Sequence, residues 1–187
     1  MSTTKMASGT QFPSIVLPVV GSGPQDIGKA QKSGAWKMVI MYRGKFCPLC
    51  TMYLKQVQES YEDILAGGTE VIAVSINPKE KAETYAKENN FSFPIAYDLS
   101  VEHMKSLGLY ISDPLSASEG DHPFSEPGLF VITPEGIVQV VEISNAPFAR
   151  PDLSMIKQSL EYIKQPPDQR YDSFGTERYP IRGSHIS

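Results

Sequence analysis

The two cysteines of this chain stand three positions apart, as Cys47-Pro48-Leu49-Cys50, and the 187 residues include no others. Random placement of two cysteines gives this spacing in only about one per cent of arrangements, so chance explains it poorly. Side chains at positions i and i+3 of a helix lie close enough for two sulfurs to bridge after a small adjustment. The spacing therefore predicts a dithiol that opens and closes a disulfide.

The dithiol is placed by a strand before it and a helix after it. The apolar run 36–42 reads as a buried strand, and Gly67-Gly68 ends the following segment. That segment has the 3.6-residue apolar stripe of a core-facing helix, formed by Tyr53, Leu54, Val57, Tyr61, Ile64 and Leu65. Free backbone N–H groups and the helix dipole stabilise a thiolate at such a helix start.

Within the motif, position predicts a role for each residue. Cys47 lies at the cap of the helix, so we expect it to be the more exposed thiol and the nucleophile. Pro48 rigidifies the first turn without losing a hydrogen bond. Cys50, one turn deeper, would resolve a mixed disulfide. Arg43 could lower a thiol pKa or bind a substrate anion, or it could be an ordinary loop arginine.

Other uses of two cysteines are weaker alternatives. A structural zinc site normally needs four ligands, and the three histidines, His103, His122 and His185, are scattered. We therefore predict no metal and no cofactor. An inert buried pair remains an alternative. So does a catalytically idle binding module that uses the loop 112–127 and the tail.

Composition narrows the class of protein. The net charge of −4 without a basic stripe argues against a nucleic-acid partner, and no apolar stretch is long enough to cross a membrane. The first ten residues contain no apolar core of a signal peptide, which favours the reducing cytoplasm. A dithiol in that compartment is more often catalytic than structural.

Strand and helix patterns alternate along the chain. We predict one domain over residues 1–165 and a polar, proline-rich tail over 166–187. The expected strands are 12–20 (an edge strand or hairpin), 36–42, 70–76, 93–97, 129–132 and 137–143; the expected helices are 50–66, 78–89, 101–107 and 152–164. Residues 112–127 read as a long loop. This order predicts an α/β fold with a central mixed sheet and helices on both faces.

The stretch Tyr42-Arg43-Gly44-Lys45-Phe46-Cys47-Pro48-Leu49-Cys50 resembles the thioredoxin superfamily. More narrowly, it is similar to the peroxiredoxin-like branch of the alkyl hydroperoxide reductase/thiol-specific antioxidant (AhpC/TSA) family. The later stretch 127–136, Pro-Gly-Leu-Phe-Val-Ile-Thr-Pro-Glu-Gly, resembles the penultimate strand and turn of that group. The resemblance covers roughly residues 12–164 and implies a thioredoxin-like fold.

The departures from true peroxiredoxins concern the groups that activate peroxide. On the Pro-x-x-x-Thr-x-x-Cys signature of that family, Cys50 takes the peroxidatic position, Cys47 replaces the threonine and Arg43 replaces the proline. Pro127 stands where the family has a second, peroxide-activating arginine. In thioredoxins a cis-proline facing the dithiol holds that place, so the resemblance implies that Pro127 is cis and lies beside Cys47.

These observations predict a thiol-dependent antioxidant oxidoreductase with a Cys47–Cys50 dithiol cycle. Disulfide exchange through Cys47 is the activity that we expect from the altered signature. The alternative is a peroxidase in which Cys50 attacks the peroxide and Cys47 resolves it. The expected partners are a small peroxide or a protein or small-molecule disulfide, together with a thiol reductant, and a homodimer is left open.

Overall fold

The structure of the protein is a computed structural model that describes residues 5–165. The predicted tail over 166–187 lies outside the described residues, so the boundary after residue 165 stays a prediction. No helix in the described part of the chain is long and apolar enough to cross a membrane.

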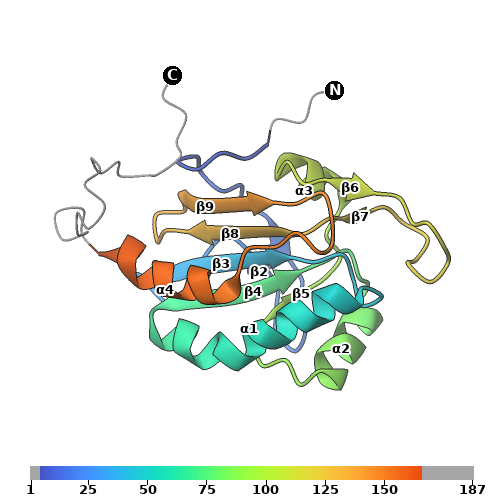
Figure 1. Cartoon of the computed structure of the whole chain (residues 1–187), viewed down its shortest axis with the longest axis horizontal. Helices are drawn as coiled ribbons and strands as arrows, with labels where there is room; N and C mark the ends of the chain where they lie inside the picture. The colour runs from blue at the N-terminus through green and yellow to red at the C-terminus, as the bar shows by residue number, and fades with distance from the viewer. Residues whose placement is uncertain (1–4, 166–187) are drawn as a thin grey trace.

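A five-stranded mixed sheet forms the centre of the molecule (Figure 1). Its order is β5-β4-β3-β8-β9, with bounds Ile95–Ala96, Thr69–Val74, Trp36–Met41, Gly128–Ile132 and Val138–Ile143. Strands β3, β4 and β5 are parallel, whereas β8 is antiparallel to both β3 and β9. The expected central strands and the closing hairpin are therefore confirmed.

The strand residues alternate between two apolar cores, one on each face of the sheet. In β3, Met38 and Ile40 point to one core, while Val39 and Met41 point to the other. The first core is covered by α1 (Pro48–Ala66), α2 (Lys79–Glu88) and α4 (Leu153–Lys164). The second is covered by α3 (Val101–Ser106) and by the N-terminal segment. Helices on both faces were predicted, and the unequal covering is new.

The helix starts differ slightly from the predicted ones. Helix α1 begins at Pro48 with Cys47 as its N-cap, two residues earlier than expected. Helix α2 begins at Lys79 with Pro78 as its N-cap, one residue later than expected. The ring of Pro78 has no N–H to lose, so it is tolerated on either side of the helix start. For α4, the carboxylate of Asp152 caps Met155 N at 3.0 Å.

Two small antiparallel sheets lie beside the main one. Strands β1 (Val16–Leu17) and β2 (Gln25–Asp26) form the hairpin expected near the N-terminus. Strands β6 (Ile111–Ser112) and β7 (Phe124–Ser125) pair across the segment that we predicted to be a loop throughout. The long connection is therefore a hairpin with a loop over 113–123, which projects from one end of the sheet in Figure 1.

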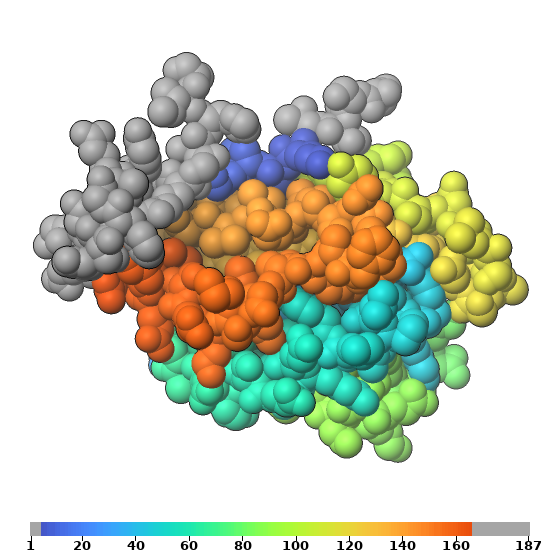
Figure 2. All heavy atoms as spheres, viewed as in Figure 1, coloured from blue at the N-terminus to red at the C-terminus, as the bar shows by residue number. Residues whose placement is uncertain are grey.

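This topology brings distant segments to one edge of the sheet. Strand β9 runs in the same direction as β3, because each of the two is antiparallel to β8. The chain therefore leaves β3 toward α1, and β9 toward α4, at the same edge. The Tyr53 hydroxyl of α1 donates to the carbonyl of Pro151 at 3.1 Å, which fastens the two segments together. Figure 2 shows the segment before α4 lying against the first turns of α1.

Candidate active site

Cys47 and Cys50 lie where β3 passes into α1, as the sequence predicted. Cys47 has an extended backbone (φ −92°, ψ 106°), and its sulfur accepts a hydrogen bond from the Cys50 backbone N–H at 3.3 Å. The side chain of Cys47 thus caps the helix as a serine normally does. Both cysteines are free thiols, so the structure represents the reduced protein.

The loop before the dithiol has a shape that requires Gly44. Its φ is +152°, and a Cβ at this position would lie 3.0 Å from Asn77 Oδ1 and 3.0 Å from the ring of Phe46. The chain can therefore turn from β3 toward Cys47 only with glycine at this position. The Cys47 backbone N–H donates to the carbonyl of Gly44 at 3.2 Å, which closes the turn.

Both cysteines are buried. Cys47 is 2% exposed and Cys50 is fully buried, so Cys47 is the more exposed of the two, as predicted, but it is not open to solvent. The reason is packing that the local sequence does not reveal. Both cysteines belong to the apolar core beneath α1 and α4, and the segment before α4 closes over the start of α1.

The two thiols differ in their tendency to ionise. A hydrogen bond from the Cys50 thiol lowers the pKa of Cys47; the Cys50 backbone N–H and the Arg43 side chain lower it further, against the effect of burial. The same thiol–thiol hydrogen bond, together with burial, raises the pKa of Cys50, although Arg150 and the Arg43 backbone act in the other direction. Of the two thiols, Cys47 is therefore the one whose surroundings favour the thiolate.

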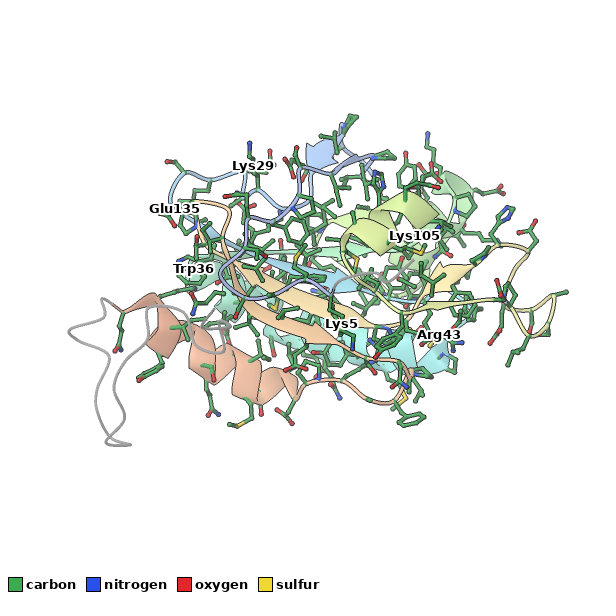
Figure 3. The ribbon with its side chains drawn as sticks, turned by 90° about the horizontal axis from the view of Figure 1, so that it is seen from above. Lys5, Lys29, Trp36, Arg43, Lys105 and Glu135 are labelled. Carbon is green, nitrogen blue, oxygen red and sulfur yellow. The ribbon has the colours of Figure 1, made fainter. Side chains whose placement is uncertain are left out.

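Arg43 lies in the predicted position and has a dense set of partners. Its Nη2 is 3.4 Å from Glu119 Oε1, and its Nε is 3.4 Å from Glu126 Oε1. The guanidinium also lies over the rings of Phe46 and Phe124, at 5.3 and 4.6 Å from their centroids. Figure 3 labels Arg43 at the end of the sheet from which the 113–123 loop projects. Arg43 is thus a half-buried part of the site and no ordinary loop arginine.

A second arginine, Arg150, was missed by the sequence reasoning. Its Nη2 donates to Cys50 Sγ at 2.9 Å, its Nε donates to the carbonyl of Pro147 at 2.9 Å, and its guanidinium lies 5.2 Å from the Tyr53 ring centroid. The signal was present in the predicted topology. Arg150 is the one basic residue between β9 and α4, and that connection reaches the same edge of the sheet as the dithiol.

Pro127 lies near this site, but its peptide bond is trans, because none of the described bonds is cis. The cis prediction is therefore wrong. The backbone runs extended from β7 into β8, held by Glu126 N to Tyr110 O at 2.8 Å and by Ser144 N to Pro127 O at 3.0 Å. A trans bond continues this extended course directly.

Beside Arg150 the surface is hollowed into a cavity of about 460 Å³. Its walls include Tyr53, Pro127 and Arg150, and its floor includes the apolar side chains of Ile40 and Leu129. Among residues 5–165, no group of three or more histidine, cysteine or acidic side chains could hold a metal ion. The dithiol and the guanidinium groups of Arg43 and Arg150 are reactive and charged groups that the structure places in this region.

Comparison with known proteins agrees with the family resemblance of the sequence. The model of the AhpC/TSA family matches residues 8–141. The chain is 23% identical over 146 residues to alkyl hydroperoxide reductase C of Amphibacillus xylanus, covering 77% of this chain and 76% of that protein. The protein of the same name from Bacillus subtilis matches with the same identity and coverage.

Solved structures share the fold at low sequence identity. Peroxidoxin BcpB from Mycobacterium tuberculosis superposes with a TM-score of 0.71 at 18% identity, covering 86% of this chain and 99% of that one. Reduced Prx3 from Vibrio vulnificus in complex with hydrogen peroxide gives 0.70 at 19% identity, with coverage of 83% and 99%. The fold is thus thioredoxin-like, as the resemblance implied. Because the family model spans more than half of the chain, the protein belongs to the AhpC/TSA family and is a thiol-dependent oxidoreductase with a peroxiredoxin-like architecture.

Proposed function

We propose that the protein is a thiol peroxidase in which Cys47 attacks a small peroxide and Cys50 resolves the product. The observation that carries this proposal is the pair of guanidinium groups, Arg43 and Arg150, at two buried sulfurs. Such donors stabilise the charge that develops on peroxide oxygens and on sulfur during the reaction. Burial favours a substrate much smaller than a protein disulfide.

The two arginines favour peroxide reduction over disulfide exchange. The sequence favoured disulfide exchange because Pro127 cannot supply the guanidinium that peroxiredoxins have at that place. Arg150 supports peroxide reduction instead, since it brings a guanidinium to Cys50 from another strand connection. The names of the curated relatives, alkyl hydroperoxide reductase C, agree with this choice.

The proposed cycle balances as follows. The Cys47 thiolate attacks the terminal oxygen of the hydroperoxide R–O–O–H, so that an S–O bond forms and the O–O bond breaks. Cys47 becomes a sulfenic acid, and the alkoxide leaves and takes up a proton as the alcohol. The Cys50 sulfur then attacks Cys47, which releases water and closes the disulfide. An external thiol reductant then reduces the disulfide and restores the dithiol. We propose that this cycle takes place in the reducing cytoplasm.

Single-turnover kinetics of two variants test the roles of the cysteines. Cys47→Ser should consume no peroxide, whereas Cys50→Ser should consume one equivalent and stop as a sulfenic acid on Cys47. Mass spectrometry after sulfenic-acid trapping identifies the oxidised residue. A rapid turnover by Cys47→Ser with sulfenic acid on Cys50 would reverse the assignment. Faster oxidation of the native protein by a model disulfide than by peroxide would favour exchange.

A further inference from the structure

The Arg43 guanidinium lies over the ring of Phe46, the residue directly before the proposed nucleophile, and its position is set by residues distant in sequence. Phe46 lies in its own loop, but Glu119, Phe124 and Glu126 come from the β6–β7 hairpin, roughly 80 residues further along the chain. A long arginine side chain has many conformations, so a fixed donor needs partners that hold it. The question is which partner sets its position.

Glu126 is the most firmly fixed of these partners. Its side chain is 5% exposed, and its backbone N–H donates to the carbonyl of Tyr110 at 2.8 Å. Its Oε1 accepts a hydrogen bond from the Ser112 hydroxyl at 2.7 Å and faces Arg43 Nε at 3.4 Å. Within residues 5–165, neither the buried Oε2 nor Arg43 Nε has a hydrogen-bond partner, so Glu126 and Arg43 form an ion pair without a hydrogen bond. The carboxylate is thus tied to β6 and β7 on one side and presents its charge to Arg43 on the other.

Glu119 is a different kind of partner for the same guanidinium. Its side chain is 19% exposed and belongs to the 113–123 loop, where it also accepts a hydrogen bond from Leu115 N at 2.8 Å. Leu115 itself is 92% exposed, so this loop has little packing to hold Glu119 in place. Glu119 accepts a hydrogen bond from Arg43 Nη2 at 3.4 Å, so it provides a comparison carboxylate on a less constrained segment.

We propose that Glu126 is a positioning residue that holds the Arg43 guanidinium against Cys47, so that the β6–β7 hairpin is part of the reaction site. The inference deepens the proposed function and rests on Cys47 as the attacking thiolate. The carboxylates that pair with Arg43 are Glu119 and Glu126, and its remaining contacts are the two aromatic rings. The Arg43 side chain also lowers the pKa of Cys47. No other described carboxylate forms an ion pair with it.

Charge and position can be separated at residue 126, because they act on Cys47 in opposite directions. Glu126→Gln keeps an oxygen that can accept from Arg43 and Ser112 but removes a negative charge, which leaves the guanidinium more effective. Glu126→Ala removes both the charge and the contact, which frees Arg43 to leave Cys47. The first change should lower the pKa of Cys47 or leave it unchanged, and the second should raise it.

The experiment is a pH titration of thiolate ultraviolet absorbance in the reduced protein. Alkylation by iodoacetamide at each pH, read by peptide mass spectrometry, assigns the step to Cys47. Glu126→Ala should lower the thiolate fraction below that pKa about tenfold, and Arg43→Gln at least as much. The double variant should show no further loss, because both changes remove one interaction. Glu119→Ala should change the fraction less than Glu126→Ala, because Glu119 lies on the less constrained segment.

Several results would overturn the proposal. An unchanged Cys47 pKa in Glu126→Ala, with a raised one in Arg43→Gln, would show that Arg43 needs no holder. Equal shifts in Glu126→Ala and Glu126→Gln would show that only charge matters. If Glu126→Ala does not fold, Ser112→Ala decides, because loss of the hydroxyl on Oε1 should still raise the pKa. The titration uses no peroxide, so it can succeed or fail independently of the proposed peroxidase activity.

Discussion

Arg43 and Arg150 approach the same dithiol from two different connections, and they are held in contrasting ways. Arg43 lies between two carboxylates, Glu119 and Glu126. Arg150 is held by a carbonyl oxygen and an aromatic ring, and it forms no ion pair with a described carboxylate. One guanidinium is therefore largely compensated, while the other presents its full charge to sulfur. The contrast separates a donor whose charge is shared with carboxylates from one whose charge is not.

The largest effect on the reaction is expected when the charge of Arg150 is removed. In Arg150→Gln, Cys50 loses the charge that favours its thiolate, so closure of the disulfide should slow about 10- to 100-fold. The sulfenic acid on Cys47 should then accumulate after a pulse of peroxide, as measured by trapping and mass spectrometry.

Arg150→Lys is the control for this variant, because it keeps the charge but loses the planar fork, and it should recover part of the rate. Unchanged closure in Arg150→Gln, with no accumulation of sulfenic acid, would mean that the uncompensated guanidinium is not used in the second step.

Removing the charge of Arg43 should lower the stability of the fold more than removing the charge of Arg150. Arg43→Gln leaves the buried carboxylate of Glu126 without its cation, so the free energy of unfolding should fall by about 2 kcal/mol. Arg150→Gln leaves no carboxylate unpaired and should cost much less. Urea unfolding of both variants in the reduced state measures the difference. Equal losses in the two variants would contradict the distinction between compensated and uncompensated arginines.

The pH dependence of stability should also divide between the two thiols. The pKa of Cys47 is lowered by folding, so its contribution to stability is lost as the pH falls through the folded pKa and is complete above about 8.5, the ordinary thiol value. The pKa of Cys50 is raised by folding, so the folded state loses stability as the pH rises above about 8.5.

Relative to a Cys47→Ser/Cys50→Ser double variant, the reduced protein should therefore be most stable near pH 8.5, with slopes of about 1 kcal/mol per pH unit. In Arg43→Gln, the increase of this stability difference below pH 8.5 should cover a narrower pH range, and its decrease above pH 8.5 should be unchanged. A stability difference that does not vary with pH would show that neither thiol is perturbed by folding. Urea unfolding at a series of pH values measures it.

The sequence predicted the parts of the site that are local. The apolar run before Cys47 and the helical stripe after Cys50 placed the dithiol correctly, because both signals lie within a few residues of the motif. The burial of the two sulfurs was not predictable in the same way, since it depends on the segment before α4, about 100 residues away.

The remaining site residues also differ in whether nearby sequence or distant segments determine their positions. Arg43 was recognised because it precedes the motif, whereas Arg150 was missed although the predicted order of strands contained the information. The cis prediction for Pro127 came from resemblance alone, and the strand pairing around that bond overrules it. The ion pair of Arg43 with Glu126 depends on the pairing of β6 with β7. The proline- and serine-rich sequence of this segment does not predict that pairing.

The hydrogen bond from Arg150 to Cys50 spans 100 positions of the chain, and this separation has a consequence for biosynthesis. During translation the two cysteines emerge from the ribosome well before Glu126 and Arg150, and domains complete their folding only when distant segments have arrived. Until then the thiols lack the guanidinium groups and the burial that distinguish them, and they behave as ordinary, weakly reactive cysteines. Reactivity toward oxidants is thus acquired together with the finished fold, so the unfinished chain is spared premature oxidation.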